Sequence, residues 1–256
     1  MYCKKCGAEN KEGSSFCTKC GAPLQTTFSG RVDYEILYRP SYSLAEVKLK
    51  TEQSITVEGG AMVYMSPNLV MATEAKGGIF GSLKRSFLGG ESFFMNTYTA
   101  QGGSGVIGLA PPLSGDVIYR ELDAETLFVT SGCYMASDPE ILIDTKFGGA
   151  KTFFAREGLF LLKLEGTGYM FMSSYGALHE VELQSGEQFV IDTGHIVAFD
   201  QNVSWGVKRI GGLKSTLFSG EGLVAKFEGP GKVYAQTRSE DAFLSWLIPK
   251  LPRERG

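Results

Sequence analysis

Four cysteines lie within the first twenty residues, in two pairs that each enclose two residues, and a glycine follows each pair. A two-residue spacer lets both sulfurs of a pair point at one ion, and zinc in a structural site prefers four thiolates in a tetrahedron. This spacing predicts a zinc ribbon over residues 1–24 that binds one structural zinc ion through Cys3, Cys6, Cys17 and Cys20.

The alternative reading of the same cysteines is a pair of disulfides. We favour zinc, because nothing ahead of Cys3 has the pattern of a secretory signal and intracellular thiols are normally kept reduced. A closed site of four thiolates has no open coordination position for a substrate. The ribbon therefore predicts a small metal-stabilised module and leaves the function of the remaining chain open.

Size and composition narrow the possible classes of protein. The chain has 256 residues, which is enough for the ribbon and one sizeable body or two small ones. A net charge of −3 provides no general basic field, so a nucleic-acid partner is not expected. The uncharged stretch over 92–115 is interrupted by glycines and prolines, and we therefore expect no transmembrane segment and a cytoplasmic protein.

Residues 33–238, which follow a short linker at 25–32, have the patterning of β structure. Apolar and polar residues alternate in several short stretches, as at 46–50, 54–58 and 180–184. A period of two residues is typical of strands with one buried face, so a mainly β body is predicted.

The C-terminal segment, residues 239–256, has a different pattern. Ser239 is followed by two acidic residues and an apolar run that stops at Pro249. Serine before acidic residues is typical of a helix N-terminus, so a short helix is predicted there.

The β body contains an internal repeat in its sequence. Each repeat has a glycine between two apolar stretches, then a glycine-bearing turn, a strand that begins near a glutamate and a Gly-x-Gly turn. The three segments are about 33–115, 116–177 and 178–238, and their first glycines, the landmark glycines, are Gly60, Gly132 and Gly194. Such short units cannot cover a hydrophobic face alone, so we expect one β body with pseudo-threefold symmetry.

Two motifs of the first segment resemble those of a known family. Residues 78–94 are rich in glycine and contain Lys84 and Arg85, and residues 105–111 read Gly-Val-Ile-Gly-Leu-Ala-Pro. These motifs are similar to those of the family related to the tryptophan RNA-binding attenuator (TRAP-like) fold, whose fungal members support mitochondrial biogenesis and inner-membrane organisation. The resemblance covers roughly 33–237. It implies three TRAP-like β units with assembly into rings or trimers, bacterial relatives that carry an N-terminal ribbon, and no enzymatic activity, cofactor or catalytic residue set.

Candidate catalytic residues are few. The only histidines are His179 and His195, too few for the several histidines of a cupin-like metal centre. Cys133 and His195 each follow a landmark glycine, so pseudo-symmetry would place them in equivalent positions, where they could form a thiol–imidazole pair. The alternative is a small buried thiol and an unrelated histidine.

Two segments are candidate contact sites for a partner or a membrane. Lys84 and Arg85 lie beside Phe87 in the glycine-rich stretch, where they could touch an anionic lipid surface or a protein, or else remain solvated on the body. The apolar run 243–248 could dock on a membrane or a neighbouring subunit, although packing against its own β body is the commoner fate.

These observations favour a non-enzymatic scaffold that presents a β body and a zinc-ribbon docking module to protein or membrane-associated partners. One alternative is binding of single-stranded RNA or a small ligand by the TRAP-like body. A second is a thiol-dependent enzyme that uses Cys133 and His195.

Overall fold

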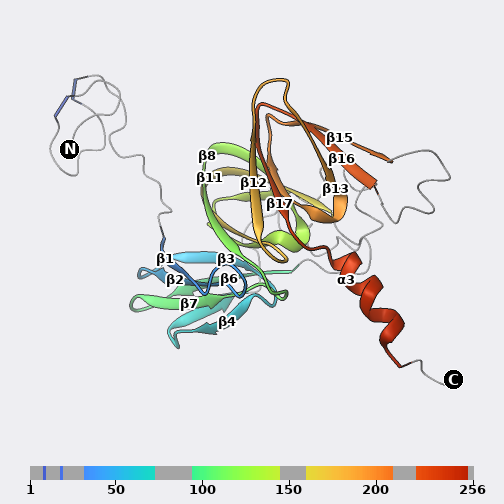
Figure 1. Cartoon of the computed structure of the whole chain (residues 1–256). Coiled ribbons are helices and arrows are strands. Elements are labelled where there is room, and N and C mark those ends of the chain that lie inside the picture. Colours follow the sequence, from blue (N-terminus) through green and yellow to red (C-terminus); the bar gives the residue numbers. More distant parts are fainter. Residues whose placement is uncertain are drawn as a thin grey trace. The chain divides into compact units, whose positions relative to one another are not determined.

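The computed structural model divides the chain into two compact units, residues 1–31 and residues 32–256. It describes residues 8–9, 18–19, 32–72, 94–144, 160–209 and 223–252. The strands and helices of these residues all belong to the second unit, where antiparallel strands make up most of the regular structure (Figure 1). The prediction of a mainly β protein is confirmed.

The first segment forms two groups of antiparallel strands. Its strands are β1 (Asp33–Leu37), β2 (Leu44–Leu49), β3 (Ser54–Glu58), β4 (Met62–Met65), β5 (Leu69–Ala72), β6 (Met95–Ala100) and β7 (Gly105–Leu109). In one group β7 lies between β2 and β4, and β1 pairs with the other edge of β2. In the second group β6 lies between β3 and β5.

Long strands replace several short ones in the second segment. Its strands are β8 (Val117–Thr130), β9 (Tyr134–Ser137), β10 (Leu142–Asp144) and β11 (Leu161–Ser173). The first half of β8 pairs with the second half of β11, which also pairs with β9. The second half of β8 pairs with the first half of β11, which also pairs with β10. β8 and β11 thus each serve as two strands.

The third segment has six strands: β12 (Leu178–Leu183), β13 (Gln188–Asp192), β14 (Ile196–Asp200), β15 (Ser204–Arg209), β16 (Leu223–Glu228) and β17 (Gly231–Gln236). β17 lies between β12 and β14, and β16 lies between β13 and β15. This is the order of pairing already seen in the first two segments. We call β3, the second half of β8 and β13 the second strands, and β4, β9 and β14 the third strands.

Neighbouring segments are joined by pairing of a second strand with a third strand. β3 pairs with β9, and β8 pairs with β14, which creates one ten-stranded sheet flanked by a four-stranded and a three-stranded sheet. The second strand β13 and the third strand β4 lie in different sheets, so pairing among the described strands does not close the three segments into a ring. Pseudo-threefold symmetry and the TRAP-like assignment therefore stay predictions.

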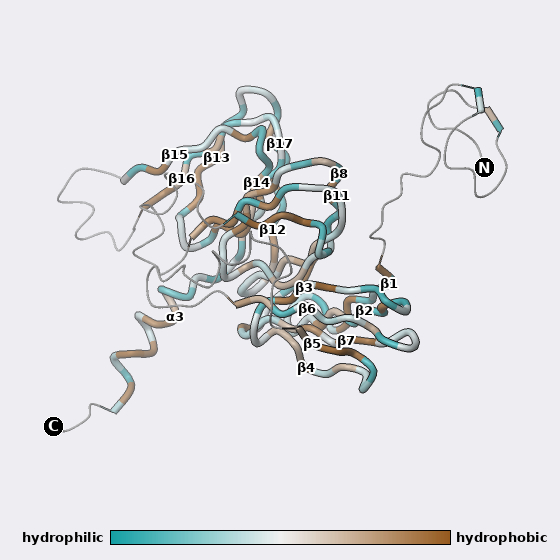
Figure 2. Tube along the Cα trace, turned by 180° about the vertical axis from the view of Figure 1, so that it is seen from behind, coloured by the Kyte–Doolittle hydropathy of each residue, from teal (hydrophilic) through white to brown (hydrophobic). Residues whose placement is uncertain are grey.

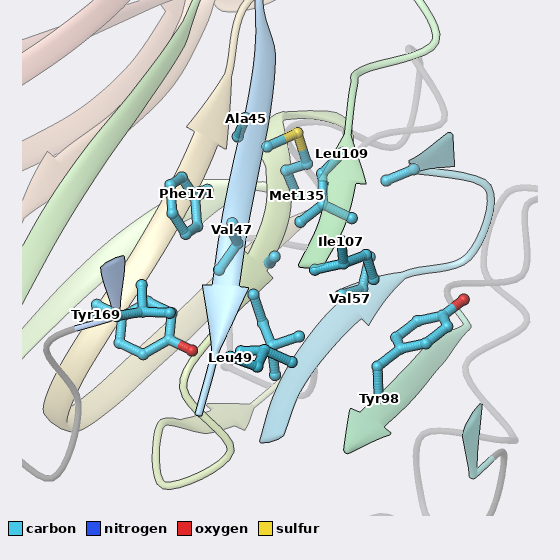
Figure 3. Packing of buried hydrophobic residues seen from close by; sticks show 14 of the residues in the cluster. Ala45, Val47, Leu49, Val57, Tyr98, Ile107, Leu109, Met135, Tyr169 and Phe171 are labelled. Carbon is cyan, nitrogen blue, oxygen red and sulfur yellow. The ribbon is translucent and has the colours of Figure 1, made fainter. Parts of the chain in front are cut away.

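Three hydrophobic clusters fill the space between the sheets. Each cluster includes residues from two successive segments, and Figure 3 shows the first of them, in which Val47 and Ile107 of the first segment pack with Met135 and Phe171 of the second. Because burial of each cluster needs two segments, the second unit folds as one body rather than as three separate modules.

The predicted C-terminal helix is present as α3 (Glu240–Leu247), followed by the short 3-10 helix η5 (Ile248–Lys250). The hydroxyl of Ser239 accepts a hydrogen bond from the Ala242 amide at 3.4 Å, as expected for a cap. None of the residues of α3 is buried, and Figure 1 shows α3 extending away from the strands. No helix in the described ranges is long and apolar enough to span a membrane.

The expectation that this helix packs against its own body was therefore wrong. Phe243 makes an edge contact with Tyr175, with ring centroids 6.2 Å apart, yet the other apolar side chains are largely exposed. Figure 2 shows hydrophobic stretches along the trace of α3. At about 100° per residue, the apolar residues over 243–248 occupy more than half of the helix circumference, so one contact with the strands cannot bury them all.

Candidate functional site

Several predicted site residues lie outside the residues that the structure describes. These are the zinc ligands Cys3, Cys6, Cys17 and Cys20, and the proposed contact residues Lys84, Arg85 and Phe87. The site described below is formed by residues of the β body.

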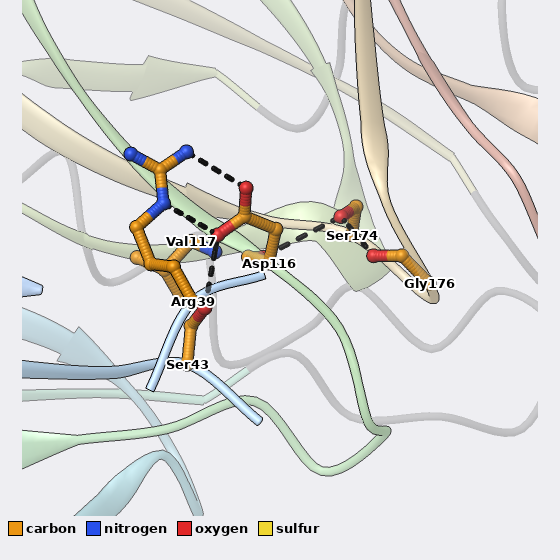
Figure 4. A network of polar contacts seen from close by, with 6 residues as sticks. All are labelled: Arg39, Ser43, Asp116, Val117, Ser174 and Gly176. Carbon is orange, nitrogen blue, oxygen red and sulfur yellow. Dashed lines mark hydrogen bonds and ion pairs between the residues drawn. The ribbon is translucent and has the colours of Figure 1, made fainter. Parts of the chain in front are cut away.

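A carboxylate at the junction of the first two segments is the centre of a network of polar contacts (Figure 4). Asp116 accepts two hydrogen bonds from Arg39, from Nε at 2.8 Å and from Nη2 at 2.7 Å. It also accepts hydrogen bonds from the hydroxyl of Ser43 at 2.9 Å and from the amide of Val117 at 2.8 Å. Asp116 thereby ties the loop before β2 to the start of β8.

The charge of Asp116 is stabilised by these donors. Burial alone would raise the pKa of its carboxyl, but hydrogen bonds from Arg39, Ser43 and the Val117 amide outweigh burial and hold the pKa below its ordinary value. The carboxylate is therefore a structural anion whose acceptor positions are taken by the protein itself, which argues against a role in acid–base catalysis.

The end of the second segment joins the same junction through the backbone. Gly115 and Gly176 form a parallel bridge, and the Asp116 amide donates to the carbonyl of Gly176 at 3.0 Å. The Ser174 amide donates to the carbonyl of Asp116 at 2.9 Å. A Cβ at Gly115 would overlap the Ser174 carbonyl oxygen, so only glycine allows this close approach.

The structure brings Cys133 and His195 to one residue, Gln236 at the end of β17. The thiol of Cys133 lies 3.7 Å from Gln236 Oε1, to which it donates, and His195 Nδ1 donates to the backbone carbonyl of Gln236 at 2.7 Å. The Gln236 side-chain amide in turn donates to the Gly194 carbonyl at 3.1 Å. Cys133 and His195 thus share Gln236 as a hydrogen-bond partner.

The environment of the thiol does not suit nucleophilic catalysis. Burial raises the pKa of Cys133 far above its ordinary value, with a smaller contribution from Glu240. A catalytic cysteine needs a lowered pKa, because the thiolate is the nucleophile. The geometry therefore supports the alternative to a catalytic pair, in which Cys133 is a small buried thiol that donates a weak hydrogen bond.

A hollow of about 300 Å³ lies where α3 leaves the body. It is lined by Tyr175, His195, Thr237, Arg238, Ser239, Ala242, Phe243 and Trp246. The lining combines aromatic rings with an arginine and a histidine, which is a chemistry suited to a small anionic group with an apolar part.

Asp116, Arg39 and Gln236 were not predicted from the sequence. A weak signal existed, because Asp116 follows Gly115 at the boundary between the first two segments and Gln236 is near the end of the third. Nothing in the sequence, however, relates Arg39 to a carboxylate 77 residues away.

The fold and the cysteine spacing together define a class of protein, a zinc ribbon attached to a mainly β body of repeatedly paired antiparallel strands. A zinc-ribbon domain model matches residues 2–24, and the model of the family described as Mitochondrial biogenesis AIM24 matches residues 34–238. The chain belongs to the Mitochondrial biogenesis AIM24 family.

Two streptococcal proteins are similar to this chain. An uncharacterized protein of Streptococcus pyogenes serotype M6 is 27% identical over 230 residues, which cover 87% of this chain and 92% of that protein. A crystal structure of a Streptococcus pyogenes protein has a TM-score of 0.70 at 27% identity and covers 86% of this chain and 100% of its own. Each match covers most of this chain.

Substitution of a predicted zinc ligand tests the ribbon. We expect Cys3→Ser to reduce bound zinc from one ion per chain to nearly none and to leave the thermal midpoint of the β body unchanged, because residues 1–31 and 32–256 form separate compact units. Elemental analysis and circular dichroism measure the two effects, and Cys133→Ala, remote in sequence from the ribbon, should retain the zinc. A lower midpoint of the body in Cys3→Ser would contradict the prediction.

Proposed function

We propose that this chain is a cytoplasmic, non-enzymatic scaffold that presents a zinc-ribbon docking module and a β body to a protein partner or a membrane-associated complex. The single observation that carries the proposal is the exposed apolar surface of α3, where Trp246 is 58% exposed. A helix with exposed apolar side chains is typical of a docking element, because water contact with those side chains is unfavourable until a partner covers them.

The charge beside this surface supports the same role. Lys250 Nζ lies 4.7 Å from the centre of the Trp246 ring, and the exposed Leu251 follows directly. An aromatic side chain beside a cation suits a partner that offers both an apolar groove and an acidic rim. Asp116 and Cys133, two polar groups inside the body, have structural partners, and this favours binding over catalysis at these residues.

The experiment compares the proteins that co-purify with three untagged full-length forms expressed in the native cell at normal level. We expect wild type and Tyr42→Ser to retain the same partner, and Trp246→Ser to lose it by about tenfold, as for a tryptophan anchor. Tyr42 is a matched control, since its side chain is exposed in the loop before β2. Equal recovery with all three forms would refute α3 as the docking element.

The hollow beside α3 favours a second candidate function, binding of a small anionic ligand with an aromatic part. Arg238 and His195 would contact the anionic group, and Tyr175 and Trp246 the aromatic part. A native mass spectrum of the untagged protein would then show a retained small molecule that is absent from His195→Ala. A spectrum of the bare chain in both forms would rule this candidate out.

A further inference from the structure

Two strands at the ends of the β body each have an edge without a partner strand in the described residues. The equivalent strands of the other segments pair through that edge. In the described part of the chain, β13 pairs only with β16, and β4 only with β7. The other second strands, β3 and β8, each pair with the third strand of the following segment. β13 is thus the second strand that has no third strand as its partner, and β4 is the third strand that has no second strand as its partner. We call β13 and β4 the unmated strands.

The two internal junctions share one register. The residue three positions before a landmark glycine lies opposite the residue four positions after the next landmark glycine: Val57 opposite Ala136, and Val129 opposite Ala198. Applied to the unmated strands, this rule places Ile191 of β13 opposite Tyr64 of β4.

The neighbouring pair follows the same rule. Thr56 lies opposite Ser137, and Phe128 lies opposite Phe199, with their rings stacked at 5.1 Å. The corresponding residues on the unmated strands are Val190 and Met65. Both are apolar, so direct contact between them would be favourable.

Exposure of the third strands differs in the way that a missing neighbour predicts. Met135–Ser137 of β9 and the equivalent Val197–Phe199 of β14 are at most 1% exposed. Their equivalents in β4 are 55% exposed at Val63, 41% at Tyr64 and 39% at Met65. On the other unmated strand, Val190 is 48% exposed. An uncharged, apolar edge strand is a ready site for pairing with another chain.

The repeat also distinguishes these edges from the remaining apolar edge, β5. The equivalents of β5 are β10 and β15, and each of them also pairs with a single neighbour in the described residues. Among the described residues, the body therefore leaves one edge of that strand position unpaired in all three segments. It pairs the position of β13 wherever a next segment follows and the position of β4 wherever a segment precedes.

We propose that β13 of one copy pairs antiparallel with β4 of a second copy, with Ile191 opposite Tyr64 and Val190 opposite Met65. The second copy would take the place of a next segment and complete a sheet of the kind already formed twice within the chain. Because the two surfaces differ, the contact is head-to-tail and repeats from copy to copy, closing into a ring or extending as a filament. This inference goes beyond the proposed function, and it does not depend on α3 or its partner.

Cysteine cross-linking between two full-length variants tests the register. We expect a mixture of Val190→Cys and Met65→Cys to form a disulfide-linked dimer under mild oxidation, visible on non-reducing gels, whereas each variant alone gives only the wild-type background. Val63→Cys in place of Met65→Cys is the matched control, because Val63 lies two residues before Met65 in β4 and is likewise exposed. Equal or stronger cross-linking of Val190→Cys with Val63→Cys would overturn the register.

The mass in solution tests the association itself. Light scattering of the wild type is expected to give at least two chains per particle at tens of micromolar, and Val190→Lys to shift the mass to one chain. Val70→Lys is the matched control, since Val70 of β5 is exposed to a similar degree and lies outside the proposed contact. A wild type of one-chain mass, or equal dissociation by both lysine variants, would overturn the proposal, and so would occupation of β4 by a strand of another protein.

Discussion

Replacement of Gly115 by alanine is expected to lower the free energy of unfolding of the β body by about 3 kcal/mol or more. The added Cβ would overlap the carbonyl oxygen of Ser174 and come within 3.0 Å of the Gly176 amide nitrogen. Both are backbone atoms, which cannot move away as a flexible side chain can. The change would force apart the bridge that joins the ends of the first two segments.

Urea unfolding of the full chain, followed by circular dichroism, measures this effect. Gly206→Ala is the matched control, because Gly206 lies in β15, and a Cβ there has no neighbouring atom within 4 Å. We expect the control to change the free energy of unfolding by less than about 0.5 kcal/mol. A similar small change for Gly115→Ala would show that the junction between segments is not tightly packed.

Removal of the charge at Asp116 is expected to cost about 2 kcal/mol of stability at pH 7. In Asp116→Asn one carboxylate oxygen is replaced by an amide NH2 group. This group is itself a donor, and it would face one of the groups that now donate a hydrogen bond to Asp116. The side chain of Asp116 is 7% exposed, so water cannot easily replace a lost partner. The Arg39 guanidinium would lose its charged acceptor.

This stability difference should depend on pH with a defined sign. The pKa of Asp116 is lower in the folded protein than in the unfolded chain, so its contribution is full above the unfolded pKa of about 4 and is lost as the pH falls through the folded value. The gap between wild type and Asp116→Asn is therefore expected to narrow below about pH 4.

Unfolding midpoints of both proteins from pH 7 to pH 3 provide the measurement. Asp33→Asn is the control, since the side chain of Asp33 is 70% exposed and lies 3.8 Å from Lys48 Nζ. An exposed pair of this kind contributes at most about 1 kcal/mol. A gap for Asp116→Asn that stays constant with pH would mean that the carboxylate charge does not stabilise the fold.

The sequence pattern predicted the secondary structure correctly where that structure depends on neighbouring residues. Alternation at 46–50 and 54–58 corresponds to β2 and β3, and Ser239 caps α3 as predicted. The landmark glycines Gly132 and Gly194 lie in short 3-10 turns that connect a second strand to a third strand. These features depend on residues within a few positions of one another, which is why they can be read from the chain.

Contacts between residues far apart in the chain were harder to predict from the sequence. The sequence placed Cys133 and His195 in equivalent positions, and the structure brings both to Gln236, but burial of the thiol could not be foreseen. The exposure of α3 was missed because burial of an apolar run depends on whether a complementary surface is available. Such a surface is a property of the assembled sheets and not of the run itself.

By itself, the sequence determined the mainly β class, the presence of a zinc-ribbon domain and the short capped helix, because cysteine spacing, alternation and capping are local properties. Only the tertiary structure decided that Arg39 meets Asp116, that Gly115 must be a glycine, and that β4 and β13 are left without the mates their equivalents have. The physical reason is that pairing and packing join residues far apart in the chain, so the contacts that define the junction exist only once the sheets have assembled.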